Sequence, residues 1–164
     1  MRDGMLSVKL ICIGKMREKY YTDAFAEYVK RLGAYCRFEC QELPECRLPD
    51  APSAGEIAAA LDKEAETVVK NIPQGSFVIP MCVEGKKLSS EGLAGIIRDR
   101  ENSGKPKLCF IIGGSYGLSE KVKQCGDFRL SMSDMTFPHH LARVMLMEQI
   151  YRGFKINEGS AYHK

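Results

Sequence analysis

One stretch of the sequence decides the fold class, and it reads Leu108-Cys109-Phe110-Ile111-Ile112-Gly113-Gly114-Ser115-Tyr116-Gly117. Its first five residues are all apolar, which is typical of a strand that is buried on both faces, as parallel strands usually are. Glycines follow where such a strand would end. We therefore predict a central parallel strand at 108–112, followed by a glycine-rich turn.

The flanking sequence alternates short apolar runs with longer amphipathic patterns, as expected of a parallel sheet covered by helices. The expected class is α/β with a mainly parallel sheet flanked by helices, in one domain over residues 1–164. The last helix carries apolar residues on more than one stripe, which predicts a core face and a second face for another subunit. The other predicted strands lie at 7–13, 37–43, 76–83 and 128–131, and the predicted helices at 15–32, 56–72, 89–100, near Ser119, and at 138–156 with Thr136 as candidate N-cap.

Composition excludes several classes of protein. The chain is 45% hydrophobic and 27% charged, which is typical of a globular domain rather than a disordered one. A formal net charge of +3 permits contact with RNA but does not identify the partner. The seven cysteines are odd in number and form no C-x-x-C pair, so we expect reduced thiols, no metal site and a cytoplasmic location. No apolar run approaches the roughly 20 residues of a membrane span.

The glycine-rich turn allows three interpretations. Glycines let a ligand approach the backbone at the carboxyl end of a strand, where ligands bind in open α/β sheets. Alternatively the turn only needs a positive φ angle. The sequence also matches G-x-S-x-G, with Ser115 as a serine-hydrolase nucleophile and Asp134 and a histidine further on. However, Gly117 and Leu118 separate this serine from its helix and no early oxyanion loop is visible, which disfavours the hydrolase.

Two more segments offer polar groups. The stretch 130–139 joins the last strand to the last helix, and its backbone amides and hydroxyls suit a polar ligand such as a carboxylate. We interpret His139 and His140 as surface or capping residues, because neighbouring helical side chains diverge. The last helix and the chain end carry Arg143, Glu148, Arg152, Tyr162, His163 and Lys164. Such a chain end is either frayed or held at a functional site.

Together these motifs resemble the ribosomal RNA large subunit methyltransferase H family, of the SPOUT class. The resemblance rests on 110–117, 131–139, 148–152 and 162–164, in that order along the chain. It extends from Met5 onward and leaves residues 1–4 as an N-terminal extension. It implies a SPOUT fold whose C-terminal part forms a deep trefoil knot, a topology that the strand pattern itself does not reveal.

The resemblance implies S-adenosylmethionine as the cofactor, bound in the knot. Its contacts would come from Met81, Gly113, Met132, Ser133, Asp134, Met135, Thr136 and Phe137. Met81 departs from the family, where leucine is usual, although a backbone contact would tolerate this change.

The implied reaction is methylation of N3 of a pseudouridine in 23S rRNA, on the assembled ribosome, by a homodimer. SPOUT relatives usually complete each site across the two-fold axis. His163 would handle the N3 proton, Arg143, Arg152 and Lys164 would bind phosphate or developing charge, and Tyr162 would stack on a base. No metal is required. The remaining alternatives are the serine hydrolase and a non-catalytic ribosome-binding module.

Overall fold

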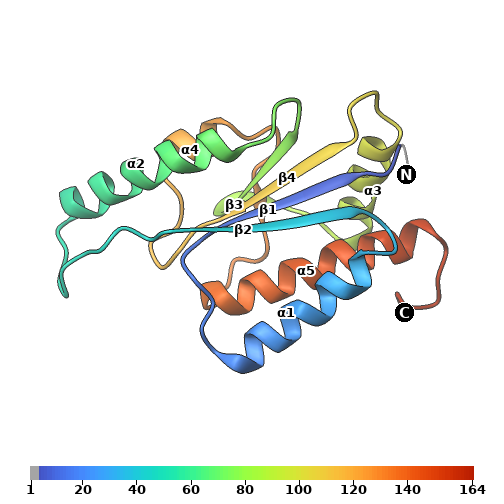
Figure 1. Cartoon of the computed structure of the whole chain (residues 1–164), viewed down its shortest axis with the longest axis horizontal. Coiled ribbons are helices and arrows are strands. Elements are labelled where there is room, and N and C mark those ends of the chain that lie inside the picture. Colours follow the sequence, from blue (N-terminus) through green and yellow to red (C-terminus); the bar gives the residue numbers. More distant parts are fainter. Residues whose placement is uncertain (1–3) are drawn as a thin grey trace.

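The computed structural model describes residues 4–164 (Figure 1). Within the predicted N-terminal extension, residues 1–3 lie outside the described part. The strands are β1 (Ser7–Ile13), β2 (Arg37–Leu43), β3 (Phe77–Lys87), β4 (Lys107–Ile112) and β5 (Leu130–Ser131). They form one sheet in the order β2-β1-β4-β3-β5, and every pairing is parallel. The predicted parallel sheet is therefore confirmed, with β4 at its centre.

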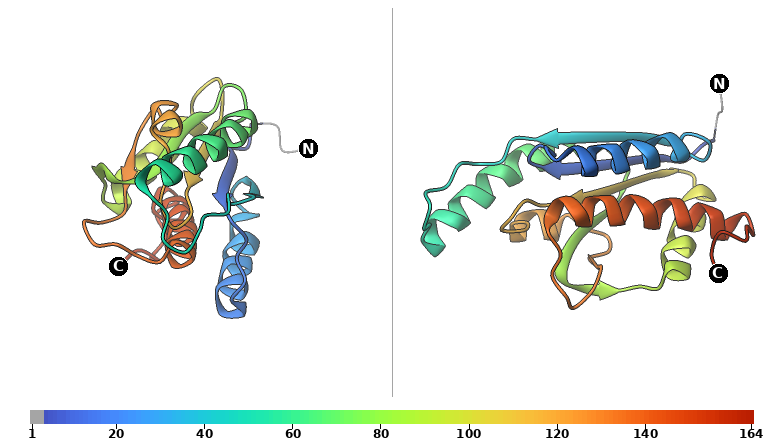
Figure 2. Two further views of the ribbon diagram at one scale, coloured as in Figure 1. Left: turned by 90° about the vertical axis from the view of Figure 1, so that its left-hand side faces the viewer. Right: turned by 90° about the horizontal axis from the view of Figure 1, so that it is seen from below.

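Helices cover both faces of the sheet (Figures 1 and 2). One face carries α1 (Lys19–Leu32), α3 (Ser90–Glu101) and α5 (His139–Asn157), and the other carries α2 (Ala54–Asn71) and α4 (Glu120–Gln124). Adjacent strand residues therefore enter different cores. Phe110 belongs to the cluster under α5, whereas Ile111 belongs to the cluster under α2. This explains why β4 is apolar at consecutive positions.

Serine side chains cap the starts of α2, α3 and α4, whereas no side chain caps α1 or α5. Ser89 accepts a hydrogen bond from the Gly92 amide at 3.0 Å, and Ser119 accepts one from the Val122 amide at 3.3 Å. The prediction that Thr136 caps the last helix is wrong. The N-cap position of α5 is Pro138, and no side chain caps this helix. Its first amides are therefore left for other partners.

Strand β3 is longer than predicted and extends beyond β4 to reach β5. Its pairing with β5 shifts register between Met81 and Lys86. Gly85 lies in this irregular part, where a Cβ atom would come within 2.8 Å of the Arg129 carbonyl oxygen. Because only glycine fits such an approach, β3 can bend around β5 and shape the space at the carboxyl end of β4.

Candidate active site

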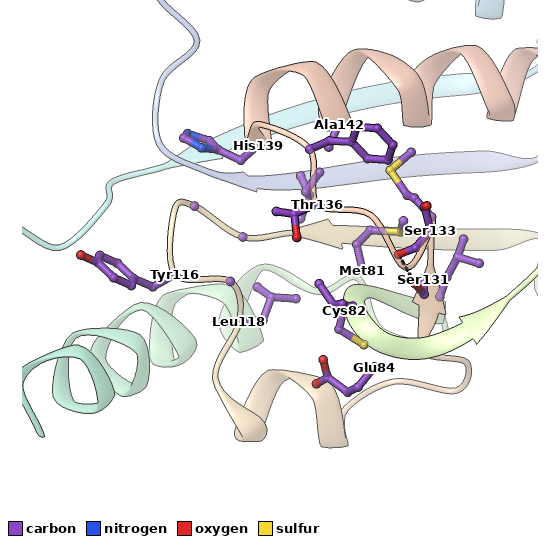
Figure 3. A pocket seen from close by; sticks show the side chains of 18 of the residues that line it. Met81, Cys82, Glu84, Tyr116, Leu118, Ser131, Ser133, Thr136, His139 and Ala142 are labelled. Carbon is purple, nitrogen blue, oxygen red and sulfur yellow. Dashed lines mark hydrogen bonds between the residues drawn. The ribbon is translucent and has the colours of Figure 1, made fainter. Parts of the chain in front are cut away.

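A cavity of about 360 Å³ opens at the carboxyl ends of β3 and β4 (Figure 3). Its walls come from three segments, namely the end of β3 (81–84), the turn after β4 (112–118) and the segment between β5 and α5 (130–137). Lys123, His139 and Ala142 complete the lining. This volume falls in the range of small-molecule sites, and the position matches the rule for ligands in open α/β sheets.

The glycine turn is shaped by its own backbone. The Gly117 amide donates a hydrogen bond to the Gly114 carbonyl at 3.1 Å, and Gly117 has a φ angle of +79°. A Cβ atom at Gly113 would lie 2.3 Å from the Gly117 carbonyl oxygen. Both glycines are therefore required to close the turn, which supports the interpretation that the turn itself needs glycine. Gly113 nevertheless lines the cavity.

The same turn does not form a nucleophile elbow. Ser115 lies at its exposed tip, and α4 begins only at Glu120. Among residues 4–164, no hydrogen bond joins the Ser115 hydroxyl to a histidine. An elbow requires the serine on a strained strand-to-helix turn with a base in reach, so the geometry argues against the hydrolase.

The segment after β5 is folded back on itself. The Ser131 hydroxyl donates to the Ser133 carbonyl at 3.1 Å, and the Ser133 hydroxyl accepts from the Met135 amide at 3.0 Å. Of the eight predicted cofactor residues, seven line the cavity, and these are Met81, Gly113, Met132, Ser133, Met135, Thr136 and Phe137. Asp134 is the exception, because its exposed carboxylate accepts from Lys87 Nζ at 2.6 Å and does not line the cavity.

Several lining residues escaped the sequence analysis. Cys82 and Val83 lie within the predicted strand but were not identified as site residues, and Glu84 lies just past its predicted end. Lys123 from α4 forms an ion pair with Glu84 at the rim. The hydrogen bond from Lys123 lowers the pKa of the Glu84 carboxyl. The sequence could have indicated these residues, because the carboxyl ends of neighbouring parallel strands meet at one edge of the sheet. Residues after Met81 are therefore expected at the site just as those after Ile112 are.

The cavity is chemically suited to a nucleoside with a charged amino-acid tail. Methionine, leucine and phenylalanine side chains form apolar walls, and serine and threonine hydroxyls and turn amides offer hydrogen bonds. S-adenosylmethionine combines those two kinds of group, so the residues present fit it. Within the described residues 4–164, no group of three or more metal-ligating side chains is close enough to hold a metal ion.

The chain end is tied down at the other end of α5. The Tyr162 hydroxyl donates to Glu148 Oε1 at 3.1 Å, and His163 Nε2 lies 2.7 Å from Glu91 Oε1. Arg152 binds Glu148 at 2.9 Å and places Nη1 3.1 Å from His163 Nδ1. The chain end is therefore not frayed in this conformation. We name Glu91, Glu148, Arg152, Tyr162 and His163 the tail cluster.

The contacts of the tail cluster indicate which tautomer a neutral His163 imidazole adopts. A guanidinium group can only donate, so the Nδ1 atom that faces Arg152 must accept. The proton of a neutral imidazole then sits on Nε2 and is donated to Glu91. Both ring nitrogens are thus engaged, and His163 has to leave one of these partners before it can act on a substrate.

Arg143 does not belong with the tail cluster. Its side chain is buried, with 1% of the residue exposed, and it lies where β1 ends. It donates to Glu42 Oε2 at 2.8 Å and to the carbonyls of Ile13 and Gly14 at 3.4 and 3.2 Å. In this conformation Arg143 joins α5 to the sheet, and its predicted role in binding phosphate or developing charge remains a prediction.

The predicted site residues fall into two groups at opposite ends of α5 (Figures 1 and 2). His139 borders the cavity, and Arg152 holds the tail cluster. Thirteen residues of helix separate them, or about 20 Å at 1.5 Å per residue. Within one chain the chain end therefore lies away from the cavity, and its predicted role beside the cofactor remains a prediction that requires a second copy.

The sequence matches a family described as "Predicted SPOUT methyltransferase" over residues 6–163. A solved structure, the tRNA (m1G37) methyltransferase of Aquifex aeolicus, superposes with a TM-score of 0.52 over 90% of this chain and 69% of that one. At 18% identity this likeness shows the fold alone. The class defined by fold and sequence is the SPOUT methyltransferases.

Curated relatives narrow the class. "Ribosomal RNA large subunit methyltransferase H" of Clostridium beijerinckii is 45% identical over 97% of this chain and all of its own length. The proteins of the same name from Clostridioides difficile and Bifidobacterium adolescentis are 43% and 46% identical over the same shares. The chain belongs to the ribosomal RNA large subunit methyltransferase H family.

Proposed function

We propose that this protein transfers a methyl group from S-adenosylmethionine to N3 of a pseudouridine in 23S rRNA, on the assembled ribosome in the cytoplasm. The observation that carries the proposal is the cavity at the carboxyl ends of β3 and β4 in a chain of this family. Its three wall segments are those where the family resemblance expects the cofactor. The names of the relatives support ribosomal RNA as the substrate. We further propose that the chain from Met5 onward acts as one domain, with the C-terminal part threaded as a trefoil knot around the cofactor.

In the proposed complex the apolar walls would hold the adenosine, and the hydroxyls and amides of 131–137 would hold the amino-acid end. Bound there, S-adenosylmethionine would supply a methyl group that is already activated for transfer by its sulfonium. The protein has to align the base nitrogen with that methyl group and remove the N3 proton.

His163 is the proposed proton acceptor, because a neutral imidazole is the side chain that accepts a proton most readily near pH 7. Arg152 would stabilise negative charge on the base once N3 loses its proton. Tyr162, with its ring 4.9 Å from the Arg152 guanidinium carbon, would stack on the pseudouridine. Lys164 would bind phosphate.

A homodimer would bring these groups to the cofactor. Within one chain the cavity and the tail cluster lie at opposite ends of α5, so a second copy is the direct way to join them. Leu141, Val144 and Met145 leave a half-buried apolar strip near the cavity end of α5, which suits such an interface. We therefore propose that each active site combines the cavity of one chain with the tail cluster of its partner.

The test is transfer of radiolabelled methyl groups from S-adenosylmethionine to ribosomes that lack the modification, followed by mass spectrometry of the nucleosides. We expect one labelled nucleoside, N3-methylpseudouridine, and less transfer to naked 23S rRNA. Ribosome association without transfer would instead support a non-catalytic binding module. Labelling of Ser115 by a fluorophosphonate would instead support a serine hydrolase.

A further inference from the structure

A second hollow of about 600 Å³ adjoins the cofactor cavity and is lined by charged side chains. It lies between the chain after β1, the chain after β2 and the start of α5. Tyr116 and His139 line both this hollow and the cofactor cavity. We name it the basic groove, after Lys15, Arg17 and Arg47, which line it.

The three cationic side chains of the basic groove are exposed and have no carboxylate partner within residues 4–164. Within residues 4–164, none of them forms an ion pair or a side-chain hydrogen bond, whereas Lys19, Arg31, Lys123 and Arg129 all have carboxylate partners. Glu45 is the one carboxylate in the lining, and Glu18 nearby is occupied by His140 at 3.0 Å. Three unpaired cations against one carboxylate give the groove a positive field that would attract an anionic ligand.

Tyr116 adds an exposed aromatic ring to the groove, which can stack on a nucleic-acid base. It lies at the tip of the glycine turn, on the boundary between groove and cavity, and 48% of its surface is exposed. An exposed aromatic ring beside a line of cations is the arrangement with which proteins hold single-stranded nucleic acid, with bases stacked on the ring and phosphates on the cations. An acidic peptide would use the cations and leave the ring without a role.

We propose that the basic groove binds the substrate RNA next to the methylated base. Lys15, Arg17 and Arg47 would contact its phosphates, and Tyr116 would stack on an adjacent base. This inference rests on the proposed function, because it assumes that the base entering the cofactor cavity belongs to an RNA strand. The shared wall of Tyr116 and His139 is what links the two sites.

The test is the triple variant K15Q/R17Q/R47Q against a matched control, K30Q/K70Q/K105Q. The control residues are exposed, likewise lack ion pairs within the described chain, and lie near the amino ends of β2, β3 and β4. Both variants lose three positive charges. Binding to ribosomes is measured without cofactor over a range of salt, and methyl transfer is measured separately.

We expect the groove variant to raise the Kd and KM for ribosomes at least about tenfold, while its affinity for S-adenosylmethionine stays at the wild-type value. The slope of log K against log salt should fall by about two to three, because each lost phosphate contact removes about one. The control should keep both Kd and slope. Tyr116→Ala should raise the KM for ribosomes without changing the slope of log K against log salt. Tyr116→Phe should keep the wild-type KM, because base stacking needs only the aromatic ring.

A groove variant with the wild-type KM and salt slope would overturn the inference and leave the proposed function intact. An equal loss in groove and control variants would also overturn it, because it would indicate a general charge effect. A wild-type protein that transfers no methyl group to ribosomes would overturn the proposed function. In that case the two binding curves still decide whether this groove holds RNA.

Discussion

The two ends of α5 differ in what shapes them. At its first turn the cofactor cavity is formed by closed backbone turns and apolar side chains, and the groups that face it include few charges. In its C-terminal half, at Glu148 and Arg152, the tail cluster is held by charge-assisted hydrogen bonds between side chains. The difference suggests that the binding of the cofactor and the chemistry on the base are built separately, about 20 Å apart in one chain. Five experiments would test this separation.

Deletion of Tyr162, His163 and Lys164 should have the largest effect. We expect turnover to fall at least about a hundredfold, because proton removal and base positioning are lost together. Affinity for S-adenosylmethionine and the Tm should stay close to wild type, since the cavity lies at the other end of α5. Calorimetry, thermal melts and methyl transfer measure the three quantities. His163→Ala, which keeps the rest of the tail, shows how much is due to the imidazole; wild-type turnover in the truncated protein would exclude the tail from the site.

Coexpression of two inactive chains tests whether the separated halves meet across a dimer. One chain carries Gly113→Val, so that its cavity is damaged and its tail cluster is intact. The other chain lacks residues 162–164, so that its cavity is intact and its tail cluster is incomplete. If each site combines two chains, random pairing should restore about a quarter of the wild-type sites. Each chain alone is the control. No restoration, or a mass by light scattering near the 18.4 kDa of one chain, would contradict the dimer.

Gly113→Val alone should damage the cavity end and leave the tail cluster unchanged. Its Cβ atom would come within 2.3 Å of the Gly117 carbonyl oxygen, so the turn has to open. We expect affinity for S-adenosylmethionine to fall at least about tenfold, equal to about 1.4 kcal/mol. Gly104→Val, where an added Cβ atom meets nothing within 4 Å, is the control and should bind normally. Unchanged affinity in a folded Gly113→Val protein would remove the turn from the site.

Arg143→Ala tests whether this buried arginine is structural. Its removal takes this donor from two backbone carbonyls and leaves Glu42 with the Met16 amide alone. We expect the free energy of unfolding to fall by about 2 kcal/mol in urea titrations, because buried carbonyls lose their donor while Glu42, with its side chain 38% exposed, stays solvated. Arg17→Ala, an exposed arginine, should change it by less than about 0.5 kcal/mol. A fully stable Arg143→Ala protein without activity would support the phosphate-binding role.

Glu91→Gln should have the smallest effect. The amide oxygen can still accept from His163 Nε2, but the negative charge beside the imidazole is gone. We expect turnover to fall about two- to fivefold, with the cofactor affinity unchanged. Asp99→Asn, on the same helix and exposed, should match wild type. Equal turnover in both variants would show that Glu91 does not position the imidazole.

Local features of the fold were predictable from sequence. The bounds of β1 and β2 match their predictions, and β4 is the central strand that its five apolar residues indicated. The serine caps of α3 and α4 were also predictable. These features depend on side-chain periodicity and on hydrogen bonds within four residues, so the sequence contains their causes directly.

Seven of the eight predicted cofactor residues line one cavity, but the resemblance to a family pointed to them and residue chemistry alone did not. The parallel sheet, the glycine turn and the set of titratable side chains could all be predicted from the sequence alone. Three features became clear only from the folded chain. Gly113 has no room for a Cβ atom because the Gly117 carbonyl lies against it. Arg143 is buried and paired with Glu42, and His163 lies beside Glu91 rather than beside the cavity. The last two of these depend on contacts between residues 101 and 72 positions apart in the chain. Burial and long-range hydrogen bonding are set by how the layers pack, and no local pattern encodes them.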